Sequence, residues 1–341
     1  MVNNEAASMS DSTIKKLPFF SIVMPAYNAG PFIGEAIESV LAQSFDDWEL
    51  VIVDDCSTDN TRDIASRYAG CHNNIRLCKR DSNSGSAYTP RKEAIILSEG
   101  RYIVPLDADD AFEACFLEKI YSRIADTGAD TVYCRLVHGD MILPVQGFDR
   151  SAVYRGRDLL QHTIGGWKIA PNGCVERRLY VDTMKKYAAA GNCMNDDELL
   201  SRQLMIAALK IAFCDAEYRY RVNPDSVSCK ISHRRFDILY TDIRLKELIY
   251  DNYISGDESR TLINVQLFND TAGMISFMMK HRDCLRGHEV EINSLIERAR
   301  CSIDWQLIEG KVSRIKSILL RIGIGPLKFA MMVYGSVKGR K

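Results

Sequence analysis

The stretch RYIVPLDADDAF, residues 101–112, places three carboxylates directly after an apolar run. The run 101–107 predicts a strand, because Ile, Val and Leu suit a strand that is buried on both faces. Asp107, Asp109 and Asp110 then fall within four positions. Carboxylates so close together repel, and each raises the pKa of its neighbour. The spacing therefore predicts a cation between them.

The residues of this acidic cluster leave two interpretations open. Asp107 and Asp109 have the spacing with which two carboxylates at a strand end bind one Mg²⁺ or Mn²⁺, directly or through water. Asp110 precedes the run AFEACF and fits the N-cap of a helix. The alternative is a solvated loop whose acidic residues only cap that helix. An isolated D-x-D does not separate the two.

Strands and helices are expected to alternate around this stretch. The strands are predicted at 19–25, 48–55, 75–79, 101–107 and 130–137. The helices are predicted at 31–44, with Pro31 in the first turn; at 57–70, capped by Ser57 or Thr58; at 86–100; and at 112–128. This alternation predicts an α/β fold with a mostly parallel sheet and helices on both faces.

A second acidic pair, Asp54 and Asp55, ends the strand at 48–55. Ligands of parallel sheets bind beyond the carboxyl ends of the strands, so we expect this pair to share one crevice with Asp107 and Asp109. Neither G-x-G-x-x-G nor G-x-x-x-x-G-K-[ST] follows a predicted strand. The sequence therefore argues against the glycine-rich nucleotide loops of dinucleotide-binding and P-loop proteins.

Helices dominate the chain from about residue 155, and we expect a helical C-terminal region. The predicted elements are helices at 175–190, 196–209, 232–255, 258–282 and 286–309, with a strand near 210–221. The expected organisation is a disordered tail over 1–17, an α/β domain over 18–228 with halves at 18–112 and 113–228, a helical extension over 229–310 and a tail over 311–341.

Composition narrows the class of protein. The chain has 341 residues, of which 46% are hydrophobic and 26% charged, as in a soluble globular protein. Its net charge of −1 argues against nucleic acid as a partner. The eleven cysteines form no C-x-x-C pair, which predicts reduced thiols in a cytosolic protein. The first 20 residues have no apolar core of signal-peptide length, so export is not expected. The six histidines are scattered, which argues against a zinc site.

The segment 311–341 concentrates positive charge. It carries eight Lys or Arg and no Asp or Glu. Ile315, Leu319, Ile322 and Ile324 are predicted to gather on one side of a helix that Gly323, Gly325 and Pro326 then break or kink. No apolar run is long enough to span a bilayer. The pattern favours either binding to an anionic membrane surface or packing on the rest of the chain or on a second copy in a homodimer.

Five segments in order resemble one enzyme family, the inverting glycosyltransferases of family 2, which have the GT-A fold. They are FSIVMPAYN (20–28), AIESVLAQSFDDWELVIVDDCSTDNT (36–61), NSGSAYTPRKEAIILSEGRYIVPLDADD (83–110), MNDDELLSRQL (194–204) and YRYRVNPDSVS (218–228). The chain departs from the family's pattern at Cys56, where Gly is usual, at Lys92 for Asn, at Asp196 for Glu and at Asn223 for His.

The resemblance assigns the donor side of a site. It implies that Mn²⁺ or Mg²⁺ holds the diphosphate of a nucleotide sugar, with Asp109 as metal ligand. Asp107 would lie near the ribose or share the metal through water, and Asp55 would accept a hydrogen bond from the base, uracil being expected. Pro25, Ala26 and Tyr27 would line the base pocket. Arg91 would face phosphate or orient the acidic cluster, its alternative being a solvated helix charge.

The acceptor side needs a general base, because the attacking hydroxyl must lose a proton. By resemblance this base is Asp197, with Asp196 as the adjacent alternative and helix capping by both as the competing role. Trp167 either stacks on an acceptor sugar or belongs to the core. One displacement inverts the anomeric centre.

The implied function is sugar transfer to a hydroxyl of a saccharide or lipid-linked acceptor, in the synthesis of lipopolysaccharide, capsule or exopolysaccharide of bacteria. The enzyme would be cytoplasmic or peripheral at the inner face of the plasma membrane. One alternative is a nucleotidyltransferase, which should carry a Gly-rich, basic loop where this chain has PAYNAGPF. The other is an inactive nucleotide-sugar-binding protein.

Overall fold

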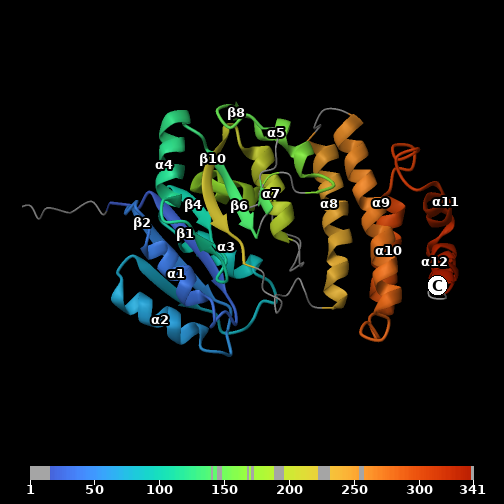
Figure 1. The fold of residues 1–341 in the computed structure, drawn as a ribbon, viewed down its shortest axis with the longest axis horizontal. Helices are drawn as coiled ribbons and strands as arrows, with labels where there is room; N and C mark the ends of the chain where they lie inside the picture. Colours follow the sequence, from blue (N-terminus) through green and yellow to red (C-terminus); the bar gives the residue numbers. More distant parts are fainter. Residues whose placement is uncertain are drawn as a thin grey trace, which may run out of the picture.

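The computed structural model describes residues 16–139, 141–143, 148–166, 169, 173–187, 196–221, 231–252 and 257–338, and Figure 1 shows their arrangement. Ten strands form one sheet, whose main path runs β3-β2-β1-β4-β9-β6-β10-β5. The strands are β1 (Phe20–Ala26), β2 (Trp48–Asp54), β3 (Ile75–Lys79), β4 (Tyr102–Pro105), β5 (Ala111–Phe112), β6 (Thr131–His138), β7 (Met141–Leu143), β8 (Val153–Tyr154), β9 (Gly173–Glu176) and β10 (Ile211–Arg219).

The N-terminal half of the sheet is parallel. β1 pairs with β2 on one side and with β4 on the other, and β2 pairs with β3. Three helices make the crossovers: α1 (Ile33–Leu41), α2 (Thr61–Cys71) and α3 (Tyr88–Leu97). All seven residues of β1 and all seven of β2 are buried, which explains why these strands are apolar without alternation. The predicted α/β fold is confirmed.

The second half of the sheet mixes directions. β9 lies between β4 and β6 and runs antiparallel to both, whereas β6 and β10 are parallel. The short strands β5, β7 and β8 add antiparallel pairs at β10 and β6. The helices of this half are α4 (Phe116–Thr127), α5 (Gly156–Leu159), the 3₁₀ helix η1 (Leu160–Thr163), α6 (Arg177–Lys186) and α7 (Asp196–Ala207).

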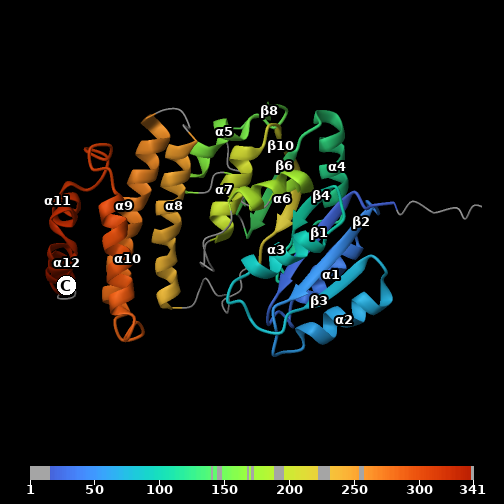
Figure 2. The same ribbon diagram turned by 180° about the vertical axis from the view of Figure 1, so that it is seen from behind.

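Helices cover both faces of the sheet, as predicted. On one face α1, α2 and α4 pack on β1, β2 and β4 through a core that includes Ile37, Ile52 and Ile120. On the other face α3, α6 and α7 pack on the same strands through Ile95, Tyr180 and Leu204. Figure 2 shows α3, α6 and α7 from behind. The strands β1, β2 and β4 therefore lie between two layers of helices.

The helical extension forms a row that leads away from the sheet (Figure 1). It comprises the 3₁₀ helix η3 (His233–Phe236), α8 (Asp237–Asp251), α9 (Asp257–Lys280), α10 (Glu289–Ser302), α11 (Arg314–Ile322) and α12 (Ile324–Lys338). Its own core includes Phe236, Phe268 and Ile296. A further core joins α8 and α9 to η1 and β10 through Leu160, Phe213 and Ile249.

Several predicted boundaries differ from the structure. The first helix begins at Ile33 instead of 31, and Asn60, not Ser57 or Thr58, is the N-cap residue of α2. Residues 111–112 form β5, so the helix predicted at 112–128 begins only at Phe116. β9 was predicted partly as helix. These short strands pair with distant segments, a long-range contact that local periodicity does not carry.

An acidic pair, buried Asp242 on α8 and partly buried Asp270 on α9, gives a prediction about stability. Asp242 accepts a hydrogen bond from Gln266 Nε2 at 2.6 Å, and Gln266 Oε1 accepts one from the backbone N–H of Gly165. Burial, followed by the charge of Asp270, raises the pKa of Asp242 well above its ordinary value. The folded state therefore retains a proton that the unfolded chain has released, and stability falls as pH rises above about 4.

Asp242→Asn keeps the acceptor for Gln266 and removes the ionisation. We expect its free energy of unfolding to exceed that of the parent by about 1 kcal/mol or more at pH 8, with a smaller gap at pH 5. Urea denaturation across this pH range measures the gap. Asp251→Asn, an exposed position on the same helix, is the control. A gap that does not change with pH would contradict the shifted pKa.

Candidate active site

The carboxyl ends of β1, β2 and β4 meet at one edge of the sheet. Ala26 pairs with Asp54 in the β1–β2 register, and Val23 pairs with Pro105 in the β1–β4 register. The backbone N–H of Leu106 continues that pairing by donating to Val23 O at 3.1 Å. The two acidic clusters therefore follow neighbouring strands on either side of β1, as the sequence predicted.

Asp54 holds the turn that leads into α2. Its buried carboxylate accepts hydrogen bonds from the backbone N–H of Ser57 and, at 2.9 Å, from Arg62 Nε. Cys56 lies in this turn and has a φ of 63°, in the left-handed region that favours glycine. This is the position where the resembling family has Gly. Asp54 is thus a structural residue of the turn.

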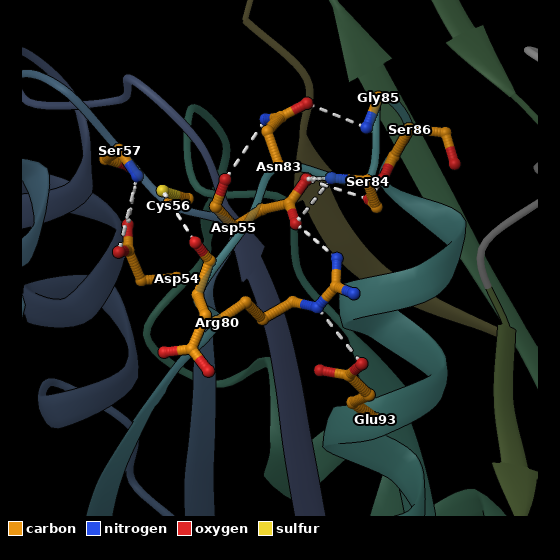
Figure 3. A network of polar contacts seen from close by, with 11 residues as sticks. Asp54, Asp55, Cys56, Ser57, Arg80, Asn83, Ser84, Gly85, Ser86 and Glu93 are labelled. Carbon is orange, nitrogen blue, oxygen red and sulfur yellow. Dashed lines mark hydrogen bonds and ion pairs between the residues drawn. The ribbon is translucent and has the colours of Figure 1, made fainter.

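Asp55 is buried and makes contacts on the opposite side, with the loop after β3 (Figure 3). Arg80 Nη1 donates to its Oδ1 at 2.6 Å, and the Ser84 hydroxyl donates to Oδ2 at 2.8 Å. The Ser84 backbone N–H lies 3.0 Å from both oxygens, and Asn83 Nδ2 donates to the Asp55 carbonyl. Both carboxylate oxygens of Asp55 are therefore already hydrogen-bonded, to Arg80 and to Ser84.

Arg91 on α3 is buried and orients Asp107. Its Nη2 donates to Asp107 Oδ1 at 2.6 Å, while the Asp107 side chain stays 32% exposed. The interpretation of Arg91 as a solvated helix charge is therefore wrong. One positive charge beside the acidic cluster is this guanidinium, which offsets part of the repulsion that the sequence predicted.

Asp110 binds β10 instead of capping a helix. Its Oδ2 accepts from the Tyr218 hydroxyl at 2.7 Å, and its Oδ1 accepts from the Arg221 backbone N–H at 2.8 Å. The Tyr218 oxygen in turn accepts from the Asp107 N–H at 3.0 Å. Burial, then the charge of Asp107, raises the pKa of Asp110 to about 7. The predicted N-cap role is wrong, since α4 has Cys115 as its N-cap residue.

Asp107 and Asp109 offer the kind of oxygen donors that a divalent cation requires. Both side chains are partly exposed, and Asp107 is held in place by Arg91 and by the backbone contact to Tyr218. Carboxylate oxygens at one site suit Mg²⁺ and Mn²⁺, which leave positions for water and phosphate oxygens. The residues present therefore fit the ion that the sequence implied.

Residues 21–162 match the family model described as glycosyl transferase family 2. Over these residues, which are fewer than half of the chain, the protein resembles a family 2 glycosyltransferase domain. Over 102 residues it is 43% identical to TuaG of Bacillus subtilis, a protein named for teichuronic acid biosynthesis. That match covers 30% of this chain and 40% of TuaG, so the chain spans less than half of this relative.

Two solved structures share the fold of this chain. The first is Staphylococcus aureus TarS 1–349 in complex with UDP-GlcNAc, with a TM-score of 0.61 and 18% identity; the match covers 93% of this chain and 91% of that chain. The second is the mannosyltransferase PcManGT of Pyrobaculum calidifontis in complex with GDP-Man and Mn²⁺, with a TM-score of 0.50 and 15% identity over 90% and 80% of the two chains. At these identities the likeness establishes the GT-A fold alone.

The residues predicted for the general base of the acceptor side lie on α7. Asp196 and Asp197 are the first two residues of this helix, and their side chains lie outside the described residues, as does Trp167. Leu200 and Leu204 are buried. Arg202, also buried, donates from Nη2 to the Thr163 carbonyl at 2.7 Å. These contacts fix the helix whose first turn carries the predicted base.

The predicted base pocket has one accessible side chain. Tyr27 is 46% exposed, whereas Pro25 and Ala26 are buried within β1.

Two residues that hold the acidic clusters were not singled out from the sequence, namely Arg80 beside Asp55 and Tyr218 beside Asp110. Arg80 lies one residue beyond β3, and Tyr218 lies in the segment YRYRVNPDSVS that the resemblance already contained. Only that segment could have drawn attention to Tyr218.

Proposed function

We propose that this protein is a metal-dependent, inverting glycosyltransferase that moves a sugar from a UDP-linked donor to a hydroxyl of a saccharide or lipid-linked acceptor. The observation that carries the proposal is the pair Asp107 and Asp109 at the edge beyond β1, β2 and β4. Arg91 and Tyr218 hold Asp107 there. The family 2 domain and the named role of TuaG support a setting in bacterial surface-polysaccharide synthesis.

The donor half of the site would bind and orient the nucleotide. Asp109 and Asp107 would hold Mn²⁺ or Mg²⁺, which supplies positive charge where the departing diphosphate becomes more negative. Arg91 keeps the Asp107 carboxylate in one orientation by its 2.6 Å hydrogen bond. Tyr27 offers an exposed ring for the base, and Asp55 would accept from uracil once Ser84 releases an oxygen.

The acceptor half would remove a proton. Asp197, in the first turn of α7, would accept the proton of the attacking hydroxyl as the sugar leaves the donor on the opposite side. The transition state resembles an oxocarbenium ion, as in glycoside hydrolysis. A single displacement inverts the anomeric centre. Trp167 would face the acceptor sugar in this arrangement.

A screen of UDP-GlcNAc, UDP-glucose and GDP-mannose with Mn²⁺ or chelator tests the function. We expect a metal-dependent rise in melting temperature with a UDP-linked donor, because a ligand bound to the folded state stabilises it. The same donor should release UDP when a saccharide acceptor is added. Binding without turnover would instead indicate an inactive binder, and release of pyrophosphate from a nucleoside triphosphate would indicate a nucleotidyltransferase.

We also propose that α11 and α12 bring the enzyme to an anionic membrane surface. Ile315, Ile318 and Ile322 form a stripe on α11 with 72%, 51% and 70% of their surfaces exposed, and Phe329, Met332 and Val333 are exposed on α12. Leu319 and Ile324, predicted to share this stripe, instead pack on the extension's core. Among the described helices, none is long and apolar enough to cross a bilayer.

Liposome flotation tests this surface. We expect full-length protein to float with anionic vesicles, less so as salt increases, since each nearby cation contributes about 1 kcal/mol. A variant with Ser at Ile315, Ile318 and Ile322 should lose binding, while one with Ser at the equally exposed Ile96, Leu209 and Val290 should keep it. Truncation is unsuitable because Leu320 and Leu327 are buried in the core. Equal flotation of both variants would refute the proposal.

A further inference from the structure

Two histidines that lie far apart in the sequence stack face to face in the helical extension. The rings of His233, in η3, and His288, the N-cap residue of α10, have centroids 3.8 Å apart and planes inclined by 6°. Glu291 is one helical turn beyond His288 and places Oε2 3.5 Å from His288 Nδ1. One ligand atom of each of the three residues lies within 4.8 Å of the other two.

We propose that His233, His288 and Glu291 bind a transition-metal ion, with zinc as the ion that these donors fit best. Imidazole nitrogen is a ligand that zinc prefers, and two histidines with one glutamate form a known zinc donor set that leaves a position for water. Asp107 and Asp109, in contrast, offer oxygen alone and suit Mg²⁺ or Mn²⁺. The two sites therefore differ in the metal they select.

The surroundings of the cluster allow a cation. Glu289 and Glu291 both lie in the first turn of α10, and their charge offsets the positive end of the helix dipole. The two arginines next to His233 have other partners. Arg234 Nη1 donates to the Gly85 carbonyl at 2.5 Å, and the Arg235 guanidinium lies over the Phe277 ring at 4.9 Å.

Binding requires a small rearrangement of the stack. A metal lies in the plane of an imidazole that ligates it, so two parallel rings cannot share one ion until one of them turns. Both rings are only partly buried, and His233 belongs to a 3₁₀ helix of four residues, so a ring can turn without disturbing a core. On binding, the contact between the two rings would be lost. One nitrogen of each histidine and one carboxylate oxygen of Glu291 would instead bind the metal.

A bound metal would fasten η3 to α10 and so act on the sheet domain. Arg234 follows His233 directly, and its contact with Gly85 holds the loop whose Ser84 binds Asp55. Gly85 has φ of 79°, and a Cβ at this position would lie 2.7 Å from Arg234 Nη1, so the contact is close. The metal would thereby keep this loop beside Asp55. The site does not depend on the proposed transfer reaction.

Titration of the full-length protein with Zn²⁺ tests the site. The protein is first treated with chelator, kept reduced, and carries Asp109→Asn so that the acidic cluster does not compete. We expect one Zn²⁺ per chain by calorimetry, and Co²⁺ in its place should show visible absorption bands. His233→Asn and His288→Asn should each weaken binding by about 10-fold or more, as loss of a direct ligand costs at least as much as loss of its supporting contacts.

Two matched variants control for other ligands nearby. Cys284 is exposed and precedes His288 in the same turn, and His281 lies against Phe277 outside the cluster. Cys284→Ser and His281→Asn should bind Zn²⁺ like the parent. Melting temperatures in chelator show that each variant is folded. Unchanged affinity in both His233→Asn and His288→Asn, or a loss confined to Cys284→Ser, would overturn the proposal.

Discussion

Asp197→Asn is expected to lower the rate of sugar transfer by about 10²-fold or more while nucleotide-sugar binding persists. Asparagine has the shape of aspartate but does not accept the proton of the attacking hydroxyl. The fold should tolerate the change, because Leu200, Leu204 and Arg202 anchor α7 from the following turns. Steady-state kinetics with the donor identified by the screen would show a loss in kcat with little change in donor KM.

Asp196→Asn is the matched control for this prediction. It removes the same charge one position earlier in the same helix, so it has the same effect on the helix dipole. A milder loss is expected. If the two variants exchange their behaviour, the base is Asp196; if neither loses rate, the base lies on another element and α7 has only a structural role.

The parallel half of the fold was predictable because its signals are local. β1, β2 and β4 are short apolar runs, each ended by polar or turn residues, and the intervening helices carry apolar faces of helical period. The antiparallel half was less predictable. β9 and β5 are four and two residues long, and they exist because they pair with strands distant in sequence.

The site shows the same division. The positions of Asp55, Asp107 and Asp109 followed from the rule that ligands bind at the carboxyl ends of parallel strands. Their partners did not, because Arg91 and Tyr218 reach the cluster from α3 and β10. A carboxylate that caps a helix and one that binds a tyrosine hydroxyl look alike in sequence, which is why Asp110 was misassigned.

Spacing in sequence also did not predict that two histidines would meet in the fold. His233 and His288 are too far apart to suggest a shared ligand site, yet η3 and the start of α10 bring their rings together. The exposed apolar residues of α11 differ from the predicted set for a related reason. The helix period groups Ile315, Leu319 and Ile322 on one side. In the structure Leu319 packs on the extension's core, whereas Ile318 is exposed.

Asp109→Asn is expected to remove the metal dependence of donor binding and to lower transfer by about 10²-fold or more, since a metal contributes several kcal/mol to a transition state that gains negative charge. In the parent, UDP with Mn²⁺ should raise the free energy of unfolding by about 2.7 kcal/mol at 100 times its Kd. The part of this gain that chelator abolishes should largely disappear in the variant, because one of the two proposed carboxylate ligands is gone.

Asp126→Asn, on the exposed side of α4, controls for the loss of one negative charge elsewhere on the domain. Thermal unfolding with UDP, in Mn²⁺ and in chelator, compares the three proteins under the same conditions. The contacts of Asp107 decide how much metal dependence the variant can keep. Arg91 and Tyr218 hold Asp107 whether or not Asp109 is present, so a residual metal effect would come from Asp107 alone. A full metal-dependent shift in Asp109→Asn would therefore place the ion away from Asp109 and remove this residue from the site.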